Sequence, residues 1–200
     1  MSRQIIFGTT NQAKVERAKR ILAQFDVEII GLDDSLNLPG PEENGKTVLE
    51  NARTKATHYS KLLKKEVLSM DSALCFNDLP EKDQPKTFVR KLNSDHRLTD
   101  REMVEEYAKL FNKYDHQVTG YWETAWVLSN GEKIIDEVVT KSSERIYAKK
   151  PSKIINKEMP LNSLQIDPET GKYFSEMNSE EHDKIWDRTS GKALARLFKP

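Results

Sequence analysis

Cysteine is almost absent from this chain of 200 residues, which contains only Cys75. A single cysteine cannot form an internal disulfide, which fits a protein of a reducing compartment. Long apolar runs are also missing, since none approaches the roughly 20 residues that cross a bilayer. The N-terminus lacks the apolar region and cleavage site of a signal peptide. We therefore expect a cytoplasmic protein with no membrane partner.

The chain likewise lacks an excess of charge of either sign. Its 32 basic and 32 acidic residues cancel, so it has no strong positive field for coating nucleic acid, and we expect no nucleic-acid partner. Mean hydropathy is −0.73, which indicates a very polar surface. A chain of this length still buries roughly 70% of its unfolded surface, enough for a core without disulfides or metals.

The first third of the sequence predicts an α/β fold. Apolar runs predict strands at 4–9 and 27–32, and the helix between them places Val15, Ala18, Ile21 and Leu22 on one face. Strand, helix and strand in this order are typical of α/β proteins. Thr47 and Glu50 predict a capping box for a helix over 47–64. A third strand over 66–70 would bring Asp71 and Ser72 to its carboxyl end, where such sheets bind ligands.

The remainder alternates between helices and longer strands. We predict helices over 85–92, 99–113 and 178–198, with 189–191 as the place where the last could be interrupted, and strands over 117–128 and 133–147. Asn130-Gly131 between the two strands predicts a hairpin with a type I′ turn, because both residues tolerate a positive φ. The sequence contains no internal repeat, low-complexity segment or linker.

Three groups of residues suggest binding chemistry. Thr9-Thr10-Asn11-Gln12-Ala13-Lys14 lies where a strand turns into a helix, and a helix N-terminus binds phosphate readily. Glu43 and Asp71 could share a Mg²⁺, which accepts one or two carboxylates plus phosphate oxygens. Arg188 could contact a base or a phosphate through its planar guanidinium. Taken separately, an ordinary helix cap, an accidental acidic pair and a charged helix face explain the three groups better than binding does.

Together, the order of these segments resembles the inosine triphosphate pyrophosphatase family, which hydrolyses non-canonical purine nucleotides. The resemblance covers nearly the whole chain. Four segments carry it. The family's opening strand, Thr/Ser-x-Asn-x-x-Lys loop and helix resemble IIFGTTNQAKVERAKRIL (5–22), and its Glu-Thr-Gly loop and Glu-Asn-Ala-x-x-Lys-Ala helix resemble PEENGKTVLENARTKA (41–56). The family's acidic segment resembles MDSALCF (70–76), and its closing segment resembles GKYFSEMNSEEHDKIWDRTSGKALARL (171–197).

The resemblance implies one nucleotide-binding domain over 1–200, built on an elongated mixed sheet whose flanking helices form two lobes with a nucleotide cleft between them, commonly in a homodimer. It implies that Asp71 and Lys14 are catalytic and that Glu43 and Asp71 bind Mg²⁺. Water would attack between the α- and β-phosphates of a nucleoside triphosphate and release the monophosphate and pyrophosphate. The implied substrate-binding residues are Thr10, Asn11, Lys14, Lys55, Ser72, Met159, His182, Asp187 and Arg188.

Several family positions are altered in this chain. Met70 replaces one of two paired acids, and Asp187 replaces a histidine before Arg188. Met159 stands where the family has a base-stacking phenylalanine, and His182 where it has a lysine. The residues that the resemblance assigns to the phosphates, which we call the phosphate half of the site, are thus kept. The residues that it assigns to the base, the base half, are changed. This leaves two rivals to the enzyme: a nucleotide-binding protein that has lost catalysis, and a structural domain that kept only the fold.

The altered base half predicts a changed substrate preference. Asp187 is acceptor-only when ionised, so it should favour a base edge that offers N–H groups. We expect a purine carrying an amino group to be preferred over inosine; the alternative is that Asp187 only pairs with Arg188 or a nearby lysine. The measurement is kcat/KM for inosine, xanthosine and guanosine triphosphates in the wild type and in Asp187→His. A wild type that prefers inosine triphosphate, with no change in the variant, contradicts the prediction.

Overall fold

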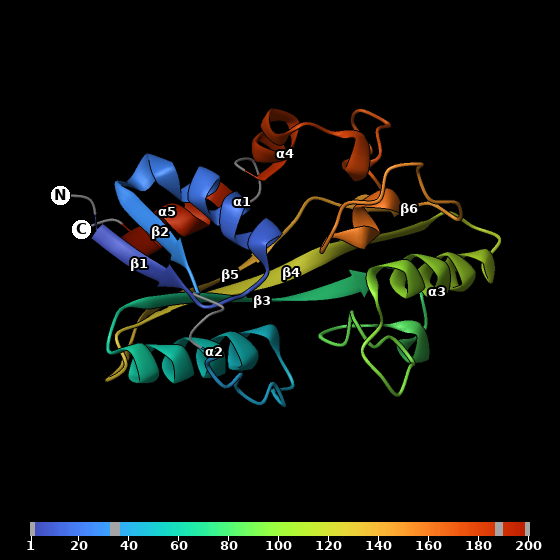
Figure 1. Ribbon diagram of the computed structural model, residues 1–200. Helices are drawn as coiled ribbons and strands as arrows, with labels where there is room; N and C mark the ends of the chain where they lie inside the picture. Colours follow the sequence, from blue (N-terminus) through green and yellow to red (C-terminus); the bar gives the residue numbers. More distant parts are fainter. Residues whose placement is uncertain (1–2, 33–36, 187–189, 199–200) are drawn as a thin grey trace. The chain divides into compact units, whose positions relative to one another are not determined.

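The computed structural model describes residues 3–32, 37–186 and 190–198 (Figure 1). The chain forms two compact units. The first contains Met1–Ser72, Glu123–Lys141 and Trp186–Pro200, and the second contains Ala73–Trp122 and Ser142–Ile185. Two long strands, β3 (Val67–Phe76) and β4 (Val118–Ser129), contribute residues to both units. In the part of the chain that is described, no helix is both long and apolar enough to span a membrane.

The first unit is built on parallel and antiparallel strands, which confirms the predicted mixed α/β fold. Strand β1 (Arg3–Phe7) pairs in parallel with β2 (Val27–Gly31) and with β3. Strand β5 (Ile134–Lys141) pairs antiparallel with β4. Helix α1 (Gln12–Leu22) connects β1 to β2, and helix α2 (Val48–Leu63) connects β2 to β3. The strand–helix–strand beginning therefore lies where the apolar periodicity predicted it.

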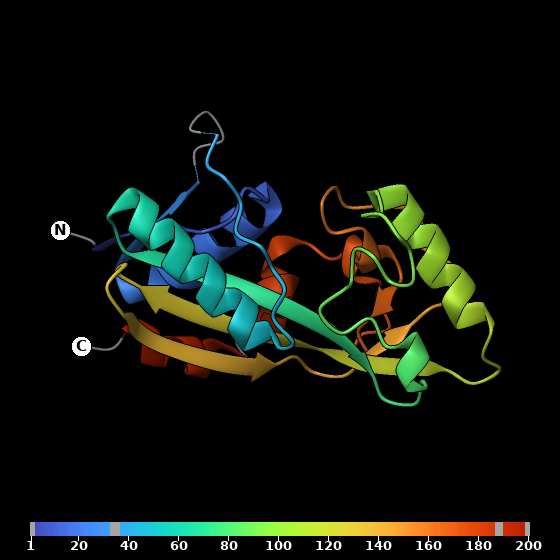
Figure 2. The same ribbon diagram turned by 90° about the horizontal axis from the view of Figure 1, so that it is seen from below.

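Helices cover both faces of this sheet (Figures 1 and 2). On one face, α1 and α5 (Lys192–Phe198) pack on Ile5, Phe7 and Trp126 in one apolar cluster. On the other face, Tyr59 of α2 packs on Val67. Ring stacking extends the first cluster, because the ring centroids of Phe7 and Trp126 lie 6.0 Å apart and the two rings are nearly parallel. Successive side chains of β1 thus alternate between the two layers, as a pleated strand requires.

The second unit has its own core around α3 (Asp100–Asn112), β6 (Arg145–Tyr147) and β7 (Gln165–Ile166). Strand β6 pairs antiparallel with the beginning of β4 and with β7. The rings of Phe76, Phe111 and Tyr147 meet with centroids 5.0–5.4 Å apart at the centre of the core. Helix α4 (Ser179–Trp186) ends where the chain returns to the first unit.

Gly120 on β4 shows how closely the backbones approach in this unit. A Cβ atom at this position would lie 2.4 Å from the carbonyl oxygen of Cys75. No real side chain fits such a distance, so any residue other than glycine would push β4 away from β3.

Three expectations about the elements are wrong. Residues 85–92 do not form a helix, because Lys86 pairs with Leu74 in a β-bridge and both Lys86 and Leu92 have positive φ. The predicted strand over 133–147 is two strands, which are separated where Ser142 bonds to the backbone of Trp122. Strand β3 does not end at Met70 but continues to Phe76, since the residues after Ser72 are also apolar and mostly buried.

The hairpin between β4 and β5 is confirmed, but its turn is not of type I′. The loop covers residues 130–133, and Gly131 has a φ of 93° while Asn130 is not among the residues with positive φ. Asn130 instead accepts the N–H groups of Glu132 and Lys133 on its side-chain oxygen. The asparagine therefore closes the loop with its side chain rather than with its own backbone conformation.

We predict that Leu22→Ala lowers the free energy of unfolding by about 2–5 kcal/mol, because Leu22 is fully buried and the change leaves a cavity. Leu62→Ala on α2 is the matched control, since Leu62 is 47% exposed and should change stability by less than about 0.5 kcal/mol. Urea unfolding followed by circular dichroism measures both. Equal effects would mean that α1 is not part of the core.

Candidate active site

The turn from β1 into α1 is shaped by one glycine and one asparagine. Gly8 donates its N–H to the carbonyl of Leu68 at 2.8 Å, and a Cβ at Gly8 would lie 2.3 Å from Ser69 Oγ. Only glycine allows β3 to pass this closely. Asn11 then caps the helix, because its side-chain oxygen accepts the N–H of Lys14 at 2.8 Å. The side-chain NH₂ of Asn11 is the donor that the cap does not use.

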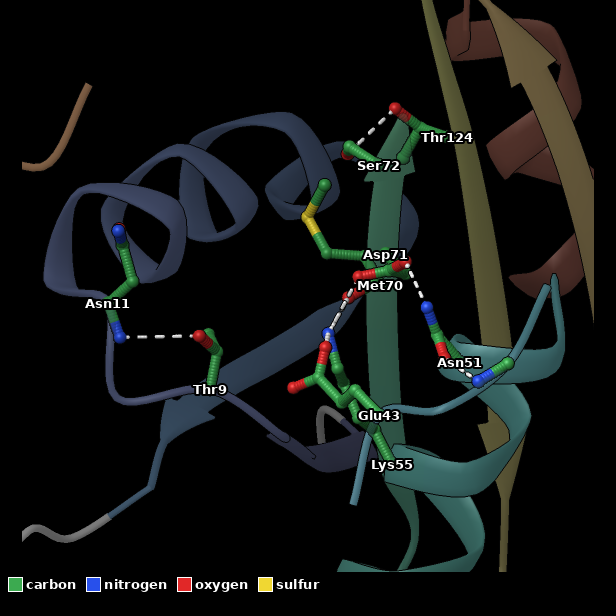
Figure 3. Close-up of polar contacts among 10 residues, drawn as sticks. Thr9, Asn11, Glu43, Asn51, Lys55, Met70, Asp71, Ser72 and Thr124 are labelled. Atoms are coloured by element: carbon green, nitrogen blue, oxygen red, sulfur yellow. Dashed lines mark hydrogen bonds and ion pairs between the residues drawn. The ribbon is translucent and has the colours of Figure 1, made fainter. Parts of the chain in front are cut away.

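Thr9, rather than Thr10, takes part in the hydrogen bonds of this turn. Thr9 Oγ1 accepts the N–H of Asn11 at 3.2 Å (Figure 3), whereas Thr10 is exposed and its carbonyl accepts from the side chain of Gln12. The Thr/Ser-x-Asn-x-x-Lys pattern already places Thr9 at its first position. Sequence reasoning missed Thr9 because it took Thr10 as the donor beside Asn11, and the contribution of Thr10 stays a prediction.

Lys14 is half-buried in the first turn of α1, not exposed as a surface lysine would be. Burial, together with the charges of Lys55 and Arg17, lowers the pKa of the Lys14 ammonium to about 8, against the smaller opposing effects of Asp71 and Glu43. A cation that is desolvated and surrounded by other cations is stabilised by an added anion. The position therefore favours a ligand with several negative charges.

A lysine on α2 connects the two carboxylates that the sequence singled out. Lys55 Nζ lies 2.8 Å from Glu43 Oε2 and 2.8 Å from Asp71 Oδ1 (Figure 3). Burial lowers the pKa of the Lys55 ammonium, but the charges of Asp71 and Glu43 outweigh this effect, and the pKa lies above its ordinary value. Lys55 therefore stays protonated, and it holds residues from the 41–46 loop and from β3 together.

Asn51 is a second residue of α2 in this site, and sequence reasoning did not select it. Its side-chain nitrogen donates to Asp71 Oδ2 at 3.1 Å, and its side-chain oxygen accepts the N–H of Gly45 at 2.9 Å. Asn51 is almost completely buried. Asn51 and Lys55 are four residues apart, so they lie on the same face of the helix. That spacing, in the Glu-Asn-Ala-x-x-Lys pattern, was the available signal.

The start of α2 also fixes the loop that carries Glu43. Thr47 Oγ1 accepts the N–H of Glu50 at 3.2 Å, as predicted. The carboxylate of Glu50 accepts the N–H of Lys46 at 2.7 Å, one residue before the position that a capping box requires. Only one half of the predicted box therefore forms. The other half holds the loop at Lys46, beside the bond between Gly45 and Asn51.

Asp71 lies in the middle of β3, and its neighbours have different roles. Met70 is buried in the apolar cluster with Phe7 and Val15, and its carbonyl accepts from Lys55 at 3.4 Å. Ser72 Oγ lies 3.0 Å from the hydroxyl of Thr124 on β4, a partner that only the tertiary structure reveals. Met70 thus contributes to core packing, and Asp71 is the carboxylate of this strand that meets Lys55.

The chemistry of these donors fits a magnesium ion with a phosphate ligand. No group of three or more His, Cys, Asp or Glu side chains gathers among residues 3–32, 37–186 and 190–198 in a way that could hold a metal. Glu43 and Asp71 do converge on one cation, the Lys55 ammonium. Mg²⁺ needs only one or two carboxylates when waters and phosphate oxygens complete its shell. It would have to share both carboxylates with Lys55.

The residues predicted for the base half belong elsewhere in the chain. Met159 and His182 are half-buried residues of the second unit. Met159 caps the short 3₁₀ helix η4 (Pro160–Ser163), and the ring of His182 packs on Phe174 with centroids 5.7 Å apart. Asp187 and Arg188 lie outside the described residues. The structure thus brings together the phosphate-half residues Asn11, Lys14, Glu43, Lys55 and Asp71 within the first unit.

The fold and site define a class: α/β proteins that combine an asparagine-capped helix after the first strand with paired carboxylates around a lysine. Within this class, residues 5–199 match the model of the Ham1 family. The chain therefore belongs to the Ham1 family. This confirms the predicted resemblance over nearly the whole chain.

Relatives and solved structures agree with this assignment. The chain is 29% identical over 201 residues to a protein of Wigglesworthia glossinidia brevipalpis named dITP/XTP pyrophosphatase, and the match covers 98% of this chain and 96% of the relative. A relative of the same name from Nitrosomonas europaea is 27% identical, with 97% and 92% covered.

Two solved structures show the same fold. The Ham1 protein of Staphylococcus aureus has a TM-score of 0.73 at 20% identity, with 98% of this chain and 97% of that chain covered. A HAM1 protein of Coxiella burnetii has a TM-score of 0.76 at 18% identity, with 98% of each chain covered. At these identities the likeness concerns the fold alone.

We predict that the affinity for inorganic tripolyphosphate falls as the pH rises through about 8, because Lys14 loses its proton there. The lowered pKa means that the positive charge is fully present below this pH and is lost above it. Lys14→Arg should remove most of this dependence, since arginine stays charged. Calorimetric titration at about pH 7 and about pH 9.5 measures both proteins. An equal fall in both would exclude Lys14 as the titrating group.

Proposed function

We propose that this protein hydrolyses a nucleoside triphosphate with a non-canonical purine base to the monophosphate and pyrophosphate, with Mg²⁺ as cofactor. The observation that carries the proposal is the convergence of Glu43 and Asp71 on Lys55, together with the charge coupling of Lys14 to these same groups. The names of the two relatives support it, since both are called dITP/XTP pyrophosphatases.

In this proposal the first unit binds the triphosphate through cations and N–H groups. The side-chain NH₂ of Asn11 and the N-terminus of α1 donate to phosphate oxygens. The negative charge of the phosphates stabilises the Lys14 ammonium, which burial and the neighbouring cations destabilise in the protein alone. Lys55 gives a second cation, and its position between two carboxylates keeps the ammonium protonated. These groups neutralise charge that increases on the phosphates in the transition state.

Asp71 is the proposed residue that orients and deprotonates the attacking water. Oδ2 of Asp71 accepts from Asn51 and Oδ1 lies against Lys55, so the carboxylate cannot rotate freely. A fixed carboxylate can hold a water in one direction, which is a requirement for in-line attack. Mg²⁺, when bound by Glu43 and Asp71, would neutralise phosphate charge and acidify a bound water.

A nucleotide-binding protein without catalysis is the second candidate. The observation that favours it is Met70, which is 5% exposed and packs in the core, where the family has a second acid. The two candidates differ in one measurement, the release of pyrophosphate from a panel of canonical and non-canonical nucleoside triphosphates with Mg²⁺. If the protein binds nucleoside triphosphates but releases pyrophosphate from none of them, the second candidate is supported. The homodimer, the cytoplasmic location and the lack of a nucleic-acid partner remain predictions from the sequence.

We predict that Asp71→Asn lowers turnover by a factor on the order of 10² or more, because it removes a general base and metal ligand. The variant should remain folded but less stable, because Lys55 loses one of its two carboxylates while Glu43 still pairs with it and asparagine still offers an oxygen to the side chain of Asn51. The assay is pyrophosphate release under saturating substrate. Asp78→Asn is the control, because Asp78 is exposed and outside the site. Near wild-type turnover in Asp71→Asn would remove this residue from the mechanism.

A further inference from the structure

Helix α1 carries more positive than negative charge. Its basic residues are Lys14, Arg17, Lys19 and Arg20, and its single acid, Glu16, lies 2.8 Å from Lys19. Lys14 and Arg17 are three residues apart, so their side chains are neighbours on one face of the helix. Like charges one turn apart repel each other. The face of α1 that carries Lys14 and Arg17 is therefore positively charged at a cost to the helix.

The guanidinium of Arg17 is stacked on an aromatic ring. Its Cζ atom lies 4.7 Å from the centroid of the Trp186 ring. Trp186 in turn lies edge-on to Trp126, with centroids 5.7 Å apart, and Trp126 stacks on Phe7 in the core. Trp126 is only 1% exposed. This column of rings begins in the interior of the first unit, so it gives Arg17 a fixed platform.

Stacking leaves the hydrogen-bond donors of Arg17 available to a ligand. A guanidinium contacts an aromatic ring with its flat face, whereas its N–H groups lie in its plane and point outward. Helical side chains lean toward the N-terminus of their helix, so Arg17 covers the turn that carries Lys14. Two of these N–H groups match the oxygens of a phosphate group. Arg17 is thus arranged to bind phosphate beside Lys14.

The charge of Arg17 also belongs to the network of the candidate site. Burial is the main cause of the lowered pKa of Lys14, and the positive charges of Lys55 and Arg17 add to it. Both carboxylates that act on Lys14, those of Asp71 and Glu43, lie 2.8 Å from Lys55. Three cations therefore share two carboxylates, and both carboxylates contact the cation of α2. An anion beside Lys14 and Arg17 would compensate the remaining positive charge.

We propose that Arg17 is a phosphate-binding residue that contacts the ligand beside Lys14, and that Trp186 is the positioning residue that holds its guanidinium. This inference rests on the proposed function, because it adds a residue to the phosphate half of that site. Every group it needs belongs to the first unit. The triphosphate then meets two cations from α1 and one from α2, and the arginine adds a paired, directional contact that a lysine cannot make.

The dissociation constant for inorganic tripolyphosphate, measured by calorimetry, tests the inference without a base. At about pH 7 the Lys14 ammonium is mostly protonated, so its titration does not mask the effect of Arg17. We expect Arg17→Ala to weaken binding about 3- to 10-fold, between the effects of an exposed ion pair and of a buried charged hydrogen bond. Arg17→Lys should restore only part of this loss, because an ammonium cannot donate two parallel bonds.

Lys19→Ala is the matched control. It removes one positive charge from the same helix, but Lys19 is exposed and pairs with Glu16. Because salt screens exposed charges, we expect this change to alter the affinity by less than about 2-fold. Circular dichroism checks that each variant is folded.

Two variants of Trp186 test its positioning role. Trp186→Leu removes the aromatic platform and keeps the charge of Arg17, so it should weaken tripolyphosphate binding less than Arg17→Ala does. Trp186→Phe should bind as the wild type does, because phenylalanine keeps an aromatic face. In an Arg17→Ala background, Trp186→Leu should have no further effect, whereas a merely structural tryptophan would give additive losses.

Three outcomes overturn the inference. Arg17→Ala could lose no more affinity than Lys19→Ala, the losses of Arg17→Ala and Trp186→Leu could add, or the wild type could fail to bind tripolyphosphate. The proposed function fails by a different result: the protein binds tripolyphosphate but releases pyrophosphate from no nucleoside triphosphate with Mg²⁺. The two failures are therefore distinguishable.

Discussion

The ion pairs of Lys55 with Asp71 and Glu43 determine how the functional half of the first unit is assembled. Asp71 and Lys55 are each almost completely shielded from water, with side-chain exposures of 11% and 12%. Removing one partner of such a buried pair typically costs about 3–5 kcal/mol, because the other charge is left uncompensated. The two charges therefore require each other. Through them, β3, α2 and the Glu43 loop have to adopt one relative arrangement, which Asn51 completes by bonding to both Asp71 and Gly45.

The same arrangement leaves Lys14 electrostatically unsatisfied. Lys55 takes both carboxylates at 2.8 Å, and Lys14 experiences mainly burial and the repulsion of neighbouring cations. The buried ion pairs thus order the loop and the strand, and they leave Lys14 as the cation that a phosphate would stabilise in the proposed function. A pH-dependent affinity follows because the unsatisfied cation is a lysine and not an arginine.

Much of the first unit could be predicted because its signals are local. The apolar face of α1, the Asn11 cap and the Thr47 cap each depend on residues within a few positions. Two of the wrong predictions arose where pairing with another strand competed with a local preference. Residues 85–92 have the composition of a helix, but Lys86 pairs with Leu74. Asp71 was placed at a strand end because polar residues usually end strands, whereas pairing and burial extend β3 beyond it.

The sequence by itself determined the family, the α/β class and the residue types of the phosphate half, since short motifs retain their order along the chain. Only the tertiary structure decided which partners these residues have. It placed Lys55 between two carboxylates, gave Ser72 the hydroxyl of Thr124, and tied Met159 to Arg90 and Asp100 through Glu158. These contacts join residues 10 to 68 positions apart. Charge and hydrogen-bonding capacity are properties of one residue, but a contact depends on how the whole chain packs, so no local pattern contains it.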